Sequence, residues 1–502
     1  MDTRYKIVLG FIGFIFVVIF ARFYYIAILK HEHFLNLSLN NIIRTEMQIP
    51  ARGQILDRNN KPLAVNELGY AISLNPYLGR KKGLEALDNE IARIIAHFPE
   101  FSAEELKKSY LAQYSPYNHS YITIIKYISY ESMLKSYTIL SQSDNIRITN
   151  ATKRHYPNDT MASHIIGYIG SANQQEIYDN EMAKYIGLVG KMGIERYYNE
   201  FLQGKLGYIK TKVDVLNRNV EILEEVGANK RFDMNLALDI DLQRHLDTQF
   251  EGKAGATIVM DATNGEILAA GSYPEYNLND FINGMNEEQW SAIRDSPATP
   301  LLNKMINGAY PPGSVIKMGL GLSFLEYGDI DERTIIETPP FMEIGGVRFR
   351  DWSEKHGSAD LIKALRRSVD VYFYRLSYKI GIENMAKTLK TMGFGEKTGV
   401  DLIGESRGIL PTPYWKLGVR GEPWRIGDTI NASIGQGLFL ATPLQIARYT
   451  ALIATGSLPV PRFAQKLGDV SALVESKDVL NDFQKSKLSA LRLGMYQVCN
   501  AG

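Results

Sequence analysis

The feature that most constrains the fold is an apolar run near the N-terminus, from Ile7 to Leu29. Every residue from Ile7 to Ala21 is apolar or glycine, and the apolar character continues beyond Arg22. About 20 consecutive apolar residues allow a helix to cross the hydrocarbon core of a bilayer. Arg22 falls near one end, where its long side chain can reach the interface. The run therefore predicts a transmembrane helix. A buried core helix is the disfavoured alternative, because the run is terminal and lacks polar residues.

Two basic residues, Arg4 and Lys6, precede this run, and no small-x-small cleavage site follows it. We therefore expect an uncleaved signal anchor rather than a signal peptide that is removed. Positive residues favour the cytoplasmic side, so the N-terminus is expected inside and the bulk of the chain outside, although Arg22 and Lys30 weaken the asymmetry. No later segment is as long and as apolar, which predicts a single-pass protein.

The length of 502 residues is too great for one ordinary domain and predicts two or three. The formal net charge of +1 gives no reason to expect a nucleic-acid partner. The one cysteine, Cys499, excludes an intrachain disulfide. We divide the chain into an anchor over 1–30, a non-catalytic module over 31–234 and a catalytic domain over 235–502.

The module over 31–234 mixes helical and strand-like segments without obvious chemistry, so we interpret it as structural or partner-binding. Its polar start, His31 to Gln48, is expected to be a partly helical stalk. A tight turn at 57–60 predicts a hairpin between Ile55-Leu56 and Pro62-Leu63-Ala64. Two helices within 84–113, a strand over 146–156 and a hairpin over 208–226 are also predicted.

The catalytic domain is expected to combine antiparallel strands with apolar helices in an α+β fold. Ala256 to Asp261 and Glu266 to Ala270 flank a turn and predict two paired strands. A run of small and apolar residues, Met318 to Leu325, predicts a buried helix.

The strongest candidate for chemistry, Tyr310 to Lys317, directly precedes that helix. Two prolines and Gly313 interrupt the chain just before Ser314, which places Ser314 at or near the helix start. Lys317 follows three residues later, so its amine lies over the same face as the serine hydroxyl. A serine hydroxyl becomes a nucleophile when a base takes its proton, and a lysine whose pKa is lowered by burial can be that base. The helix N-terminus also favours negative charge on the reacting oxygen.

Three similar patterns are interpreted as structural. Ser132-Met133-Leu134-Lys135 repeats the Ser-x-x-Lys spacing without a break before it, and is expected to be a solvated helix face. Ser143-Asp144-Asn145 is interpreted as a turn in the first module. Lys397-Thr398-Gly399 lies among regularly spaced glycines and is interpreted as a loop.

A second hydroxyl, Ser368, lies in Ser368-Val369-Asp370 after a predicted helix over 359–367. Ser368 could relay a proton between the lysine and a leaving amine. Asp370 could hydrogen-bond a substrate amide or the base. A helix cap or a turn is the alternative interpretation of these three residues.

Neither a metal nor a cofactor is expected. Asp351 and His356 are potential ligands, but two such residues without a third are weak evidence, and Cys499 is distant in the sequence. We interpret His356-Gly357 as shaping a loop. The chain has no phosphate-binding glycine loop.

Together these motifs resemble those of the class B penicillin-binding proteins, the monofunctional D,D-transpeptidases of peptidoglycan synthesis. The resemblance covers nearly the whole chain. Beyond the anchor and the nucleophile motif, it is carried by the stretches 52–64, 164–170, 187–204, 435–437 and 441–445. Within the family, Tyr310 to Ser314, Asp370 in place of the more common Asn, and Gly494-Met495-Tyr496 are most similar to the cell-elongation branch, penicillin-binding protein 2.

The resemblance implies a penicillin-binding transpeptidase fold on a pedestal module in a bacterial inner membrane. It implies that Ser314 is the acylated nucleophile, Lys317 its base and Ser368 a proton shuttle, with Asp370 beside it. The donor would be a peptidoglycan stem peptide ending in D-Ala-D-Ala, and the acceptor would be an amine of a neighbouring stem. β-Lactams would acylate Ser314 as substrate mimics. The expected partners are a RodA-type glycan polymerase and MreC.

The third family motif, Lys-Ser/Thr-Gly on the strand beside the site, is not found where it is expected. It should follow Gly494-Met495-Tyr496 closely, but the sequence ends at Gly502. We therefore expect a C-terminal truncation, and the substrate-binding residues stay unassigned. Two other functions stay open. One is a catalytically silent scaffold or β-lactam sensor. The other is a serine β-lactamase, which the anchor and the large first module disfavour.

Overall fold

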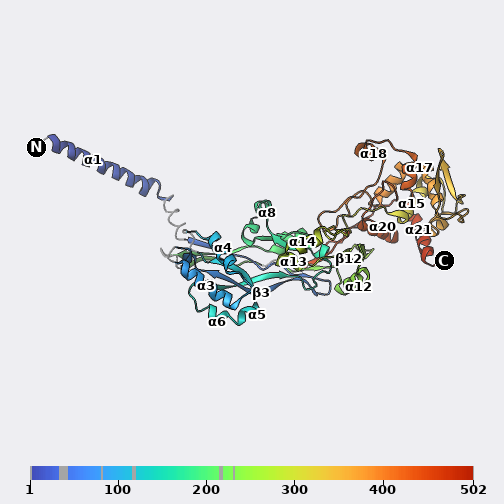
Figure 1. Cartoon of the computed structure of the whole chain (residues 1–502). Helices are drawn as coiled ribbons and strands as arrows, with labels where there is room; N and C mark the ends of the chain where they lie inside the picture. The colour runs from blue at the N-terminus through green and yellow to red at the C-terminus, as the bar shows by residue number, and fades with distance from the viewer. Residues whose placement is uncertain are drawn as a thin grey trace. The chain divides into compact units, whose positions relative to one another are not determined.

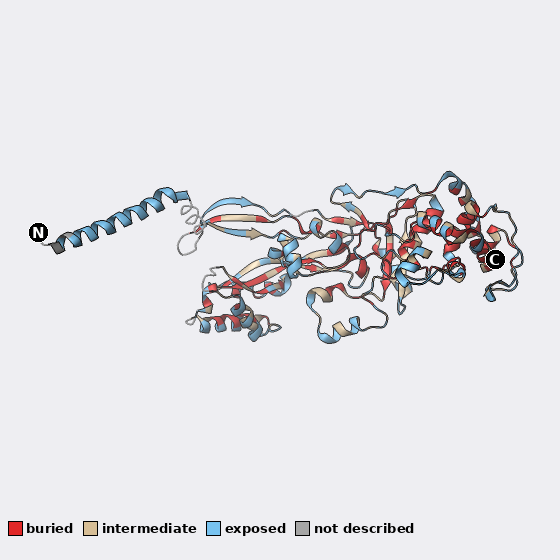
Figure 2. Cartoon of the chain, turned by 90° about the horizontal axis from the view of Figure 1, so that it is seen from above, coloured by how far each residue is buried: buried red, intermediate tan, exposed pale blue. Residues whose placement is uncertain are grey.

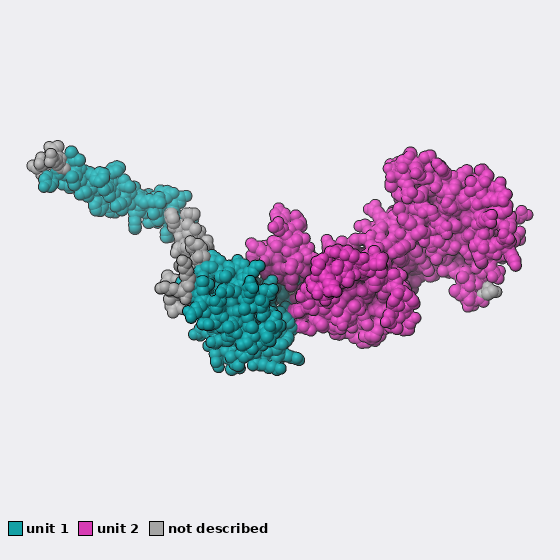
Figure 3. Space-filling view, in the orientation of Figure 1, with its two compact units in different colours: residues 1–51, 68–152, 203–230 teal, residues 52–67, 153–202, 231–502 magenta. Residues whose placement is uncertain are grey.

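The computed structural model describes residues 3–32, 43–80, 83–115, 120–213, 219–229 and 232–500. They form two compact units whose segments alternate along the chain (Figure 3). Unit 1 comprises 1–51, 68–152 and 203–230, and unit 2 comprises 52–67, 153–202 and 231–502. Strand β3 (Pro62–Leu74) and strand β5 (Ile146–His155) each run from one unit into the other.

The apolar run near the N-terminus is helical and exposed along its length (Figure 2). Helix α1 (Thr3–Tyr24) continues into a π-helical turn η1 (Tyr25–Leu29). Within the described part of the chain, Ile7–Leu29 is the one helical stretch long and apolar enough to cross a membrane. It is not the buried core helix that was the alternative interpretation.

Unit 1 contains a three-stranded antiparallel sheet in the order β1-β8-β9, formed by β1 (Ile43–Gln48), β8 (Gly207–Val213) and β9 (Asn219–Val226). The predicted hairpin over 208–226 is confirmed for its strands, while 214–218 lie outside the described residues. The predicted stalk is wrong for its last residues, because Ile43–Gln48 pairs with β8 as a strand. Its residues 33–42 lie outside the described part of the chain.

The rest of unit 1 is built on the second half of β3, which pairs antiparallel with β4 (Ile122–Ser129). The two predicted helices are confirmed as α3 (Leu84–His97) and α4 (Ala103–Gln113). Their apolar faces share a core with the strands, centred on Ile91, Ile94 and Tyr110. Two short helices, α5 (Tyr130–Leu134) and α6 (Tyr137–Leu140), follow β4.

The predicted hairpin around Asp57 is confirmed, since β2 (Ile55–Leu56) pairs antiparallel with the start of β3. The Asp57 carboxylate is fully buried. One of its oxygens accepts hydrogen bonds from the backbone N–H groups of Asn59 and Lys61, and the other accepts from that of Ile240 at 3.2 Å. Asp57 therefore closes its own turn and also binds the first turn of α12 (Ile240–Phe250).

A buried ion cluster supports the same region of unit 2. The Glu195 carboxylate has no solvent exposure and accepts hydrogen bonds from Arg52 Nε and Arg154 Nε, both at 2.7 Å. Arg154 Nη1 also donates to the Gly53 carbonyl at 2.9 Å. Because two guanidinium groups surround this one carboxylate, the pKa of Glu195 is lowered despite its burial.

Short elements surround this cluster and continue through the first part of unit 2. They are α7 (Ser163–Ile166), β6 (Ile169–Ser171), α8 (Gln174–Asp179), α9 (Glu181–Ile186), β7 (Leu188–Gly190), α10 (Gly193–Tyr197), α11 (Asn199–Gln203) and β10 (Met234–Leu236). Strands β10 and β2 are parallel, and β10 is antiparallel to β16 (Ala464–Leu467).

The predicted strand pair is confirmed as β11 (Gly255–Met260) and β12 (Ile267–Tyr273), with α12 packed on β12. The chain then builds a helical core in which α15 (Lys317–Tyr327) packs against α17 (Asp370–Thr391) and α21 (Asp482–Asn500) (Figure 1). Eight of the eleven residues of α15 are buried, because small and apolar residues occupy most of the helix. This arrangement confirms the predicted α+β class.

Further elements complete unit 2. They are α13 (Leu278–Asn283), α14 (Glu287–Arg294), β13 (Phe341–Ile344), β14 (Val347–Arg350), α16 (Leu361–Arg366), α18 (Pro413–Arg420), α19 (Ile426–Ala432), α20 (Pro443–Thr455), β15 (Leu458–Pro459), β17 (Val470–Ser471) and β18 (Ser476–Lys477).

Candidate active site

Ser314 lies on a single 3-10 turn, Gly313–Ile316, that leads directly into α15. The turn begins after Pro311 and Pro312, and Gly313 has a φ of 62°, a conformation that favours glycine. This sharp entry leaves Ser314 exposed at the head of a buried helix. The sequence predicted this position from the same prolines and glycine.

The glycine loop 435–437, which is distant in sequence, contacts the 3-10 turn that carries Ser314. The Gly313 N–H donates a hydrogen bond to the Gly435 carbonyl at 2.9 Å. A Cβ atom at Gly435 would lie 2.3 Å from the Gly313 carbonyl oxygen, so any side chain there would displace the nucleophile turn. Gly435 also has a φ of 69°. Both observations explain why glycine occupies this position in Gly435-Gln436-Gly437.

Lys317 occupies the first position of α15, and its side chain is 2% exposed. Its Nζ atom donates to Ser368 Oγ at 2.9 Å, to the Ser368 carbonyl at 3.0 Å and to Asp370 Oδ1. An ammonium group has three N–H donors, so these three acceptors satisfy all of them. The amine also lies 5.1 Å from the ring centre of Phe373.

Ser368 lies between the other two groups of the site. Its Oγ donates to Ser314 Oγ at 2.9 Å and accepts from Lys317 Nζ. In the part of the chain that the structure describes, no hydrogen bond joins Lys317 directly to Ser314. The three side chains therefore form a chain of hydrogen bonds in the order Lys317, Ser368, Ser314. Ser368 has a φ of 51°, which is unusual for a residue other than glycine.

Burial lowers the pKa of Lys317, because the charged amine loses its hydration inside the protein. The negative charge of Asp370, the hydrogen bond that Lys317 donates to it and the negative charge of Asp351 oppose this effect. A neutral Lys317 amine can accept the proton of Ser368 while Ser368 accepts that of Ser314, since each hydroxyl can both donate and accept. The arrangement can therefore deprotonate Ser314 through two short transfers.

The loop that follows β14 supplies two neighbours of the Ser368 segment: Trp352, which the sequence did not identify, and Asp351, which it considered only as a potential metal ligand. Trp352 Nε1 donates to the Ser368 carbonyl at 3.0 Å, and Asp351 Oδ2 accepts from the Val371 N–H at 3.0 Å. His356 Nε2 lies 3.3 Å from Asp351 Oδ1. Asp351 and His356 thus lie side by side, and no group of three or more His, Cys, Asp or Glu side chains suited to a metal occurs among the described residues.

The three stretches that were interpreted as structural have the local structure that the sequence predicted. Ser132 and Lys135 are both exposed, on or next to the short helix α5. The stretch 143–145 includes a turn directly before β5. The stretch 397–399 is a loop in which the Thr398 N–H donates to Glu405 Oε1 at 2.7 Å.

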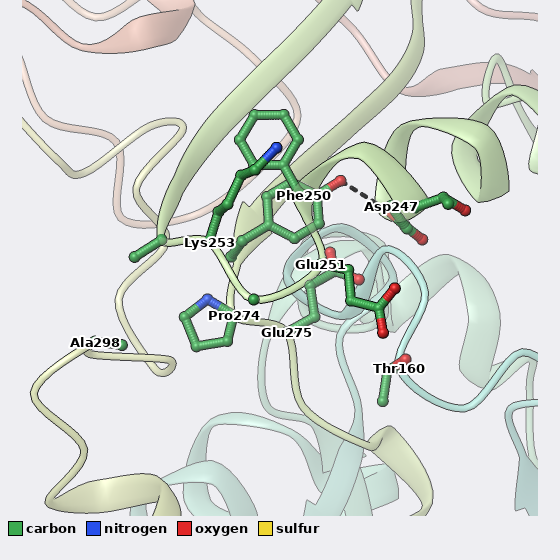
Figure 4. A pocket seen from close by; sticks show the side chains of 12 residues that line it. Thr160, Asp247, Phe250, Glu251, Lys253, Pro274, Glu275 and Ala298 are labelled. Atoms are coloured by element: carbon green, nitrogen blue, oxygen red, sulfur yellow. Dashed lines mark hydrogen bonds between the residues drawn. The ribbon is translucent and has the colours of Figure 1, made fainter.

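A separate cavity of about 540 Å³ lies at the end of α12, and none of the four predicted site residues lines it (Figure 4). Tyr273 Oη donates to Asp247 Oδ1 at 2.7 Å there. Burial raises the pKa of Asp247, and burial together with the charge of Asp247 raises that of Glu275. The residues that line the cavity include acidic and aromatic side chains and no serine.

Two family models match this chain. The penicillin-binding protein dimerisation domain matches residues 47–231, and the penicillin-binding protein transpeptidase domain matches residues 255–502. The peptidoglycan D,D-transpeptidase MrdA of Escherichia coli K12 is 30% identical over 96% of this chain and 78% of its own length.

The chain belongs to the class B penicillin-binding proteins.

MrdA of Acinetobacter baumannii, another relative of this penicillin-binding protein, is 35% identical over 88% of the chain and 66% of its own length. Among solved structures, a Helicobacter pylori penicillin-binding protein 2 in complex with MreC is 48% identical. It aligns with a TM-score of 0.85 over 91% of this chain and 84% of its own. These similarities agree with the elongation branch, penicillin-binding protein 2.

Proposed function

We propose that this penicillin-binding protein is a serine D,D-transpeptidase that cross-links peptidoglycan stem peptides during cell elongation. Ser314 Oγ attacks the carbonyl carbon between the two terminal D-alanines of a donor stem. The peptide bond breaks, the last D-alanine leaves with a proton, and an acyl-enzyme forms. An amine of a neighbouring stem then attacks this ester, forms the cross-link and returns the proton to Ser314. The names of the MrdA relatives support this activity.

The hydrogen-bonded order of Lys317, Ser368 and Ser314 is the observation that carries the proposal. We assign Ser314 as nucleophile, Lys317 as base and Ser368 as the shuttle that takes the proton of Ser314 and later gives it to the leaving amine. Asp370 holds the Lys317 amine in place. The first turn of α15 adds the positive end of a helix dipole beside the developing oxyanion.

Strand β11 pairs with β12 on one edge, and no strand pairs with its other edge among the described residues. All six residues of β11 are half-buried. An open edge presents unpaired backbone groups that can accept another strand. The free edge of β11 is therefore a place where a further strand can add to this sheet.

The position in the cell follows from the anchor. We propose a single pass through the inner membrane by Ile7–Leu29, with Arg4 and Lys6 inside and residues from 31 onward in the periplasm. MreC is a proposed partner because the Helicobacter pylori relative was solved in complex with it. A RodA-type polymerase is proposed because a 26% identical neighbour with a TM-score of 0.68 belongs to a peptidoglycan synthase complex.

The alternative functions are tested in cells whose only copy of the full-length gene encodes Ser314→Ala. We expect fewer cross-linked muropeptides and loss of cell shape, with the protein still present in the membrane. Normal cross-linking and shape would instead identify a silent scaffold. Sustained hydrolysis of penicillin by the purified wild-type protein would identify a β-lactamase.

A further inference from the structure

The loop after β14 holds the Ser368 segment at two points. Trp352 Nε1 binds the Ser368 carbonyl, and Asp351 Oδ2 binds the Val371 N–H, both at 3.0 Å. These two hydrogen bonds lie on either side of Val369 and Asp370, at the point where α17 begins. Helix α17 has no side-chain cap of its own at Val369, so Asp351 supplies an acceptor that the helix start lacks.

Ser368 needs such support because of its backbone. A residue other than glycine stays in the left-handed region only where its surroundings hold it there. With a φ of 51°, Ser368 directs its carbonyl toward Trp352 and Lys317 and its hydroxyl toward Ser314. The geometry of the carbonyl and the geometry of the hydroxyl are therefore set by one backbone conformation.

Trp352 is not held in place by hydrophobic packing. Its side chain is 65% exposed, so burial of its ring contributes little to its position. It is held by the hydrogen bond to Ser368 and by an edge-on contact with His356, whose ring centre is 5.0 Å away. The indole N–H is thus the polar contact that ties the β14 loop to the shuttle serine.

We propose that Trp352 is a positioning residue for acyl transfer, and that its indole N–H holds the Ser368 carbonyl so that the Ser368 hydroxyl stays between Lys317 and Ser314. The inference rests on the proposed function. It differs from that function because it assigns a role to a residue outside the Ser-x-x-Lys and Ser-x-Asp motifs.

The Ser368 carbonyl also accepts a hydrogen bond from Lys317 Nζ, so the indole and the amine share one acceptor. When the indole N–H is removed, the carbonyl has the Lys317 ammonium as its remaining donor and binds it more strongly. The charged groups that face Lys317 are Asp370 on α17 and Asp351 on the loop, and both already favour its charged form. Loss of the indole N–H therefore favours that form further, which moves the acid limb of the acylation rate to higher pH.

The test compares Trp352→Phe with Trp424→Phe in the full-length protein. Trp424 Nε1 also donates one hydrogen bond, to Thr429 Oγ1 at 2.9 Å, but it does not bind Ser368. The rate of acylation by a fluorescent penicillin is measured from pH 5 to pH 10, and melting temperatures are recorded. We expect Trp352→Phe to acylate about fivefold to tenfold more slowly at neutral pH, with its acid limb shifted upward. Trp424→Phe should match the wild type in both respects.

Replacement of Trp352 by benzothienylalanine keeps the ring shape and removes only the N–H donor, and it serves if the phenylalanine variant melts early. An unchanged rate and pH profile in both variants would overturn the inference. A lower rate with an unshifted acid limb would also overturn it, since loosened structure alone would have that effect. Failure of penicillin to acylate the wild type would instead contradict the proposed function.

Discussion

Ser368 Oγ lies 2.9 Å from Lys317 Nζ and 2.9 Å from Ser314 Oγ, so one hydroxyl connects the base to the nucleophile. Lys317 and Ser314 are three residues apart in the sequence, yet the hydrogen-bonded path between them passes through a residue more than fifty positions later. The base therefore acts on Ser314 through Ser368, which lies two residues before the start of α17. Any change that moves this helix start is expected to slow acylation.

Removal of the shuttle hydroxyl is the first prediction. Ser368→Ala breaks the path from Ser314 to Lys317, and we expect acylation by penicillin to slow by about 10²-fold to 10⁴-fold. Ser377→Ala is the matched control, because Ser377 lies on α17, the helix that follows Ser368, and its hydroxyl donates to the Tyr374 carbonyl at 3.1 Å. Rates are measured with a fluorescent penicillin. A Ser368→Ala rate within threefold of the wild type would show that Lys317 does not need the shuttle.

The charge of Asp370 is expected to set the pH dependence of the acylation rate. Burial lowers the pKa of Lys317, and Asp370 opposes this by charge and by hydrogen bonding. Asp370→Asn removes the opposing charge, so the pKa of Lys317 falls further and the neutral amine persists to lower pH. We expect the acid limb of the acylation profile to move to lower pH in this variant. A shift to higher pH, or none, would contradict the assignment of Lys317 as base.

The buried cluster at Glu195 predicts a large effect on stability. Glu195→Ala leaves Arg52 and Arg154 buried without their carboxylate, and we expect a loss of about 3–5 kcal/mol. Glu200→Ala, at an exposed position, should change stability by less than about 0.5 kcal/mol. Denaturant unfolding of the two variants measures both values. Equal stabilities would show that the cluster does not stabilise the folded state.

His164 predicts a loss of stability in acid. Burial and the nearby Lys304 lower the pKa of His164 to about 4, from 6.5. Between these values the unfolded chain binds a proton that the folded chain does not. The contribution of His164 to the free energy of unfolding is therefore fully present above pH 6.5. It is lost as the pH falls from 6.5 through 4, and the total loss is about 3 kcal/mol.

His164→Phe should flatten this dependence, because phenylalanine has no proton to bind and can keep the edge contact with Tyr276. The exposed His245→Phe is the control and should follow the wild type. Melting temperatures between pH 4 and pH 7 measure the effect. Parallel pH profiles for His164→Phe and the wild type would refute the role of this histidine.

The sequence predicted those elements that a short run of neighbouring residues determines. The apolar run predicted α1, and Pro311, Pro312 and Gly313 predicted the turn that presents Ser314. Ser368 and Asp370 were found by family resemblance, with a helix cap or turn as the local alternative. The structure brings these side chains together, and their catalytic roles stay predictions.

Contacts between distant segments could not be read from the sequence. Arg52 and Glu195 are 143 residues apart, and neither has a local signal for burial. Trp352 stands in a polar loop, and its partner is a backbone carbonyl, which every residue has. Strand β1 was expected to be part of a stalk because its residues are polar. It forms a strand because β8 supplies its hydrogen-bonding partners.

The central claim is that Ser314 is the acylated nucleophile. Purified full-length protein is incubated with benzylpenicillin and digested, and the modified peptide is identified by mass spectrometry. We predict one penicilloyl group on the peptide that contains Ser314, none on the peptide with the exposed Ser132, and no adduct in Ser314→Ala. An adduct on another residue, or one that persists in Ser314→Ala, would contradict the account.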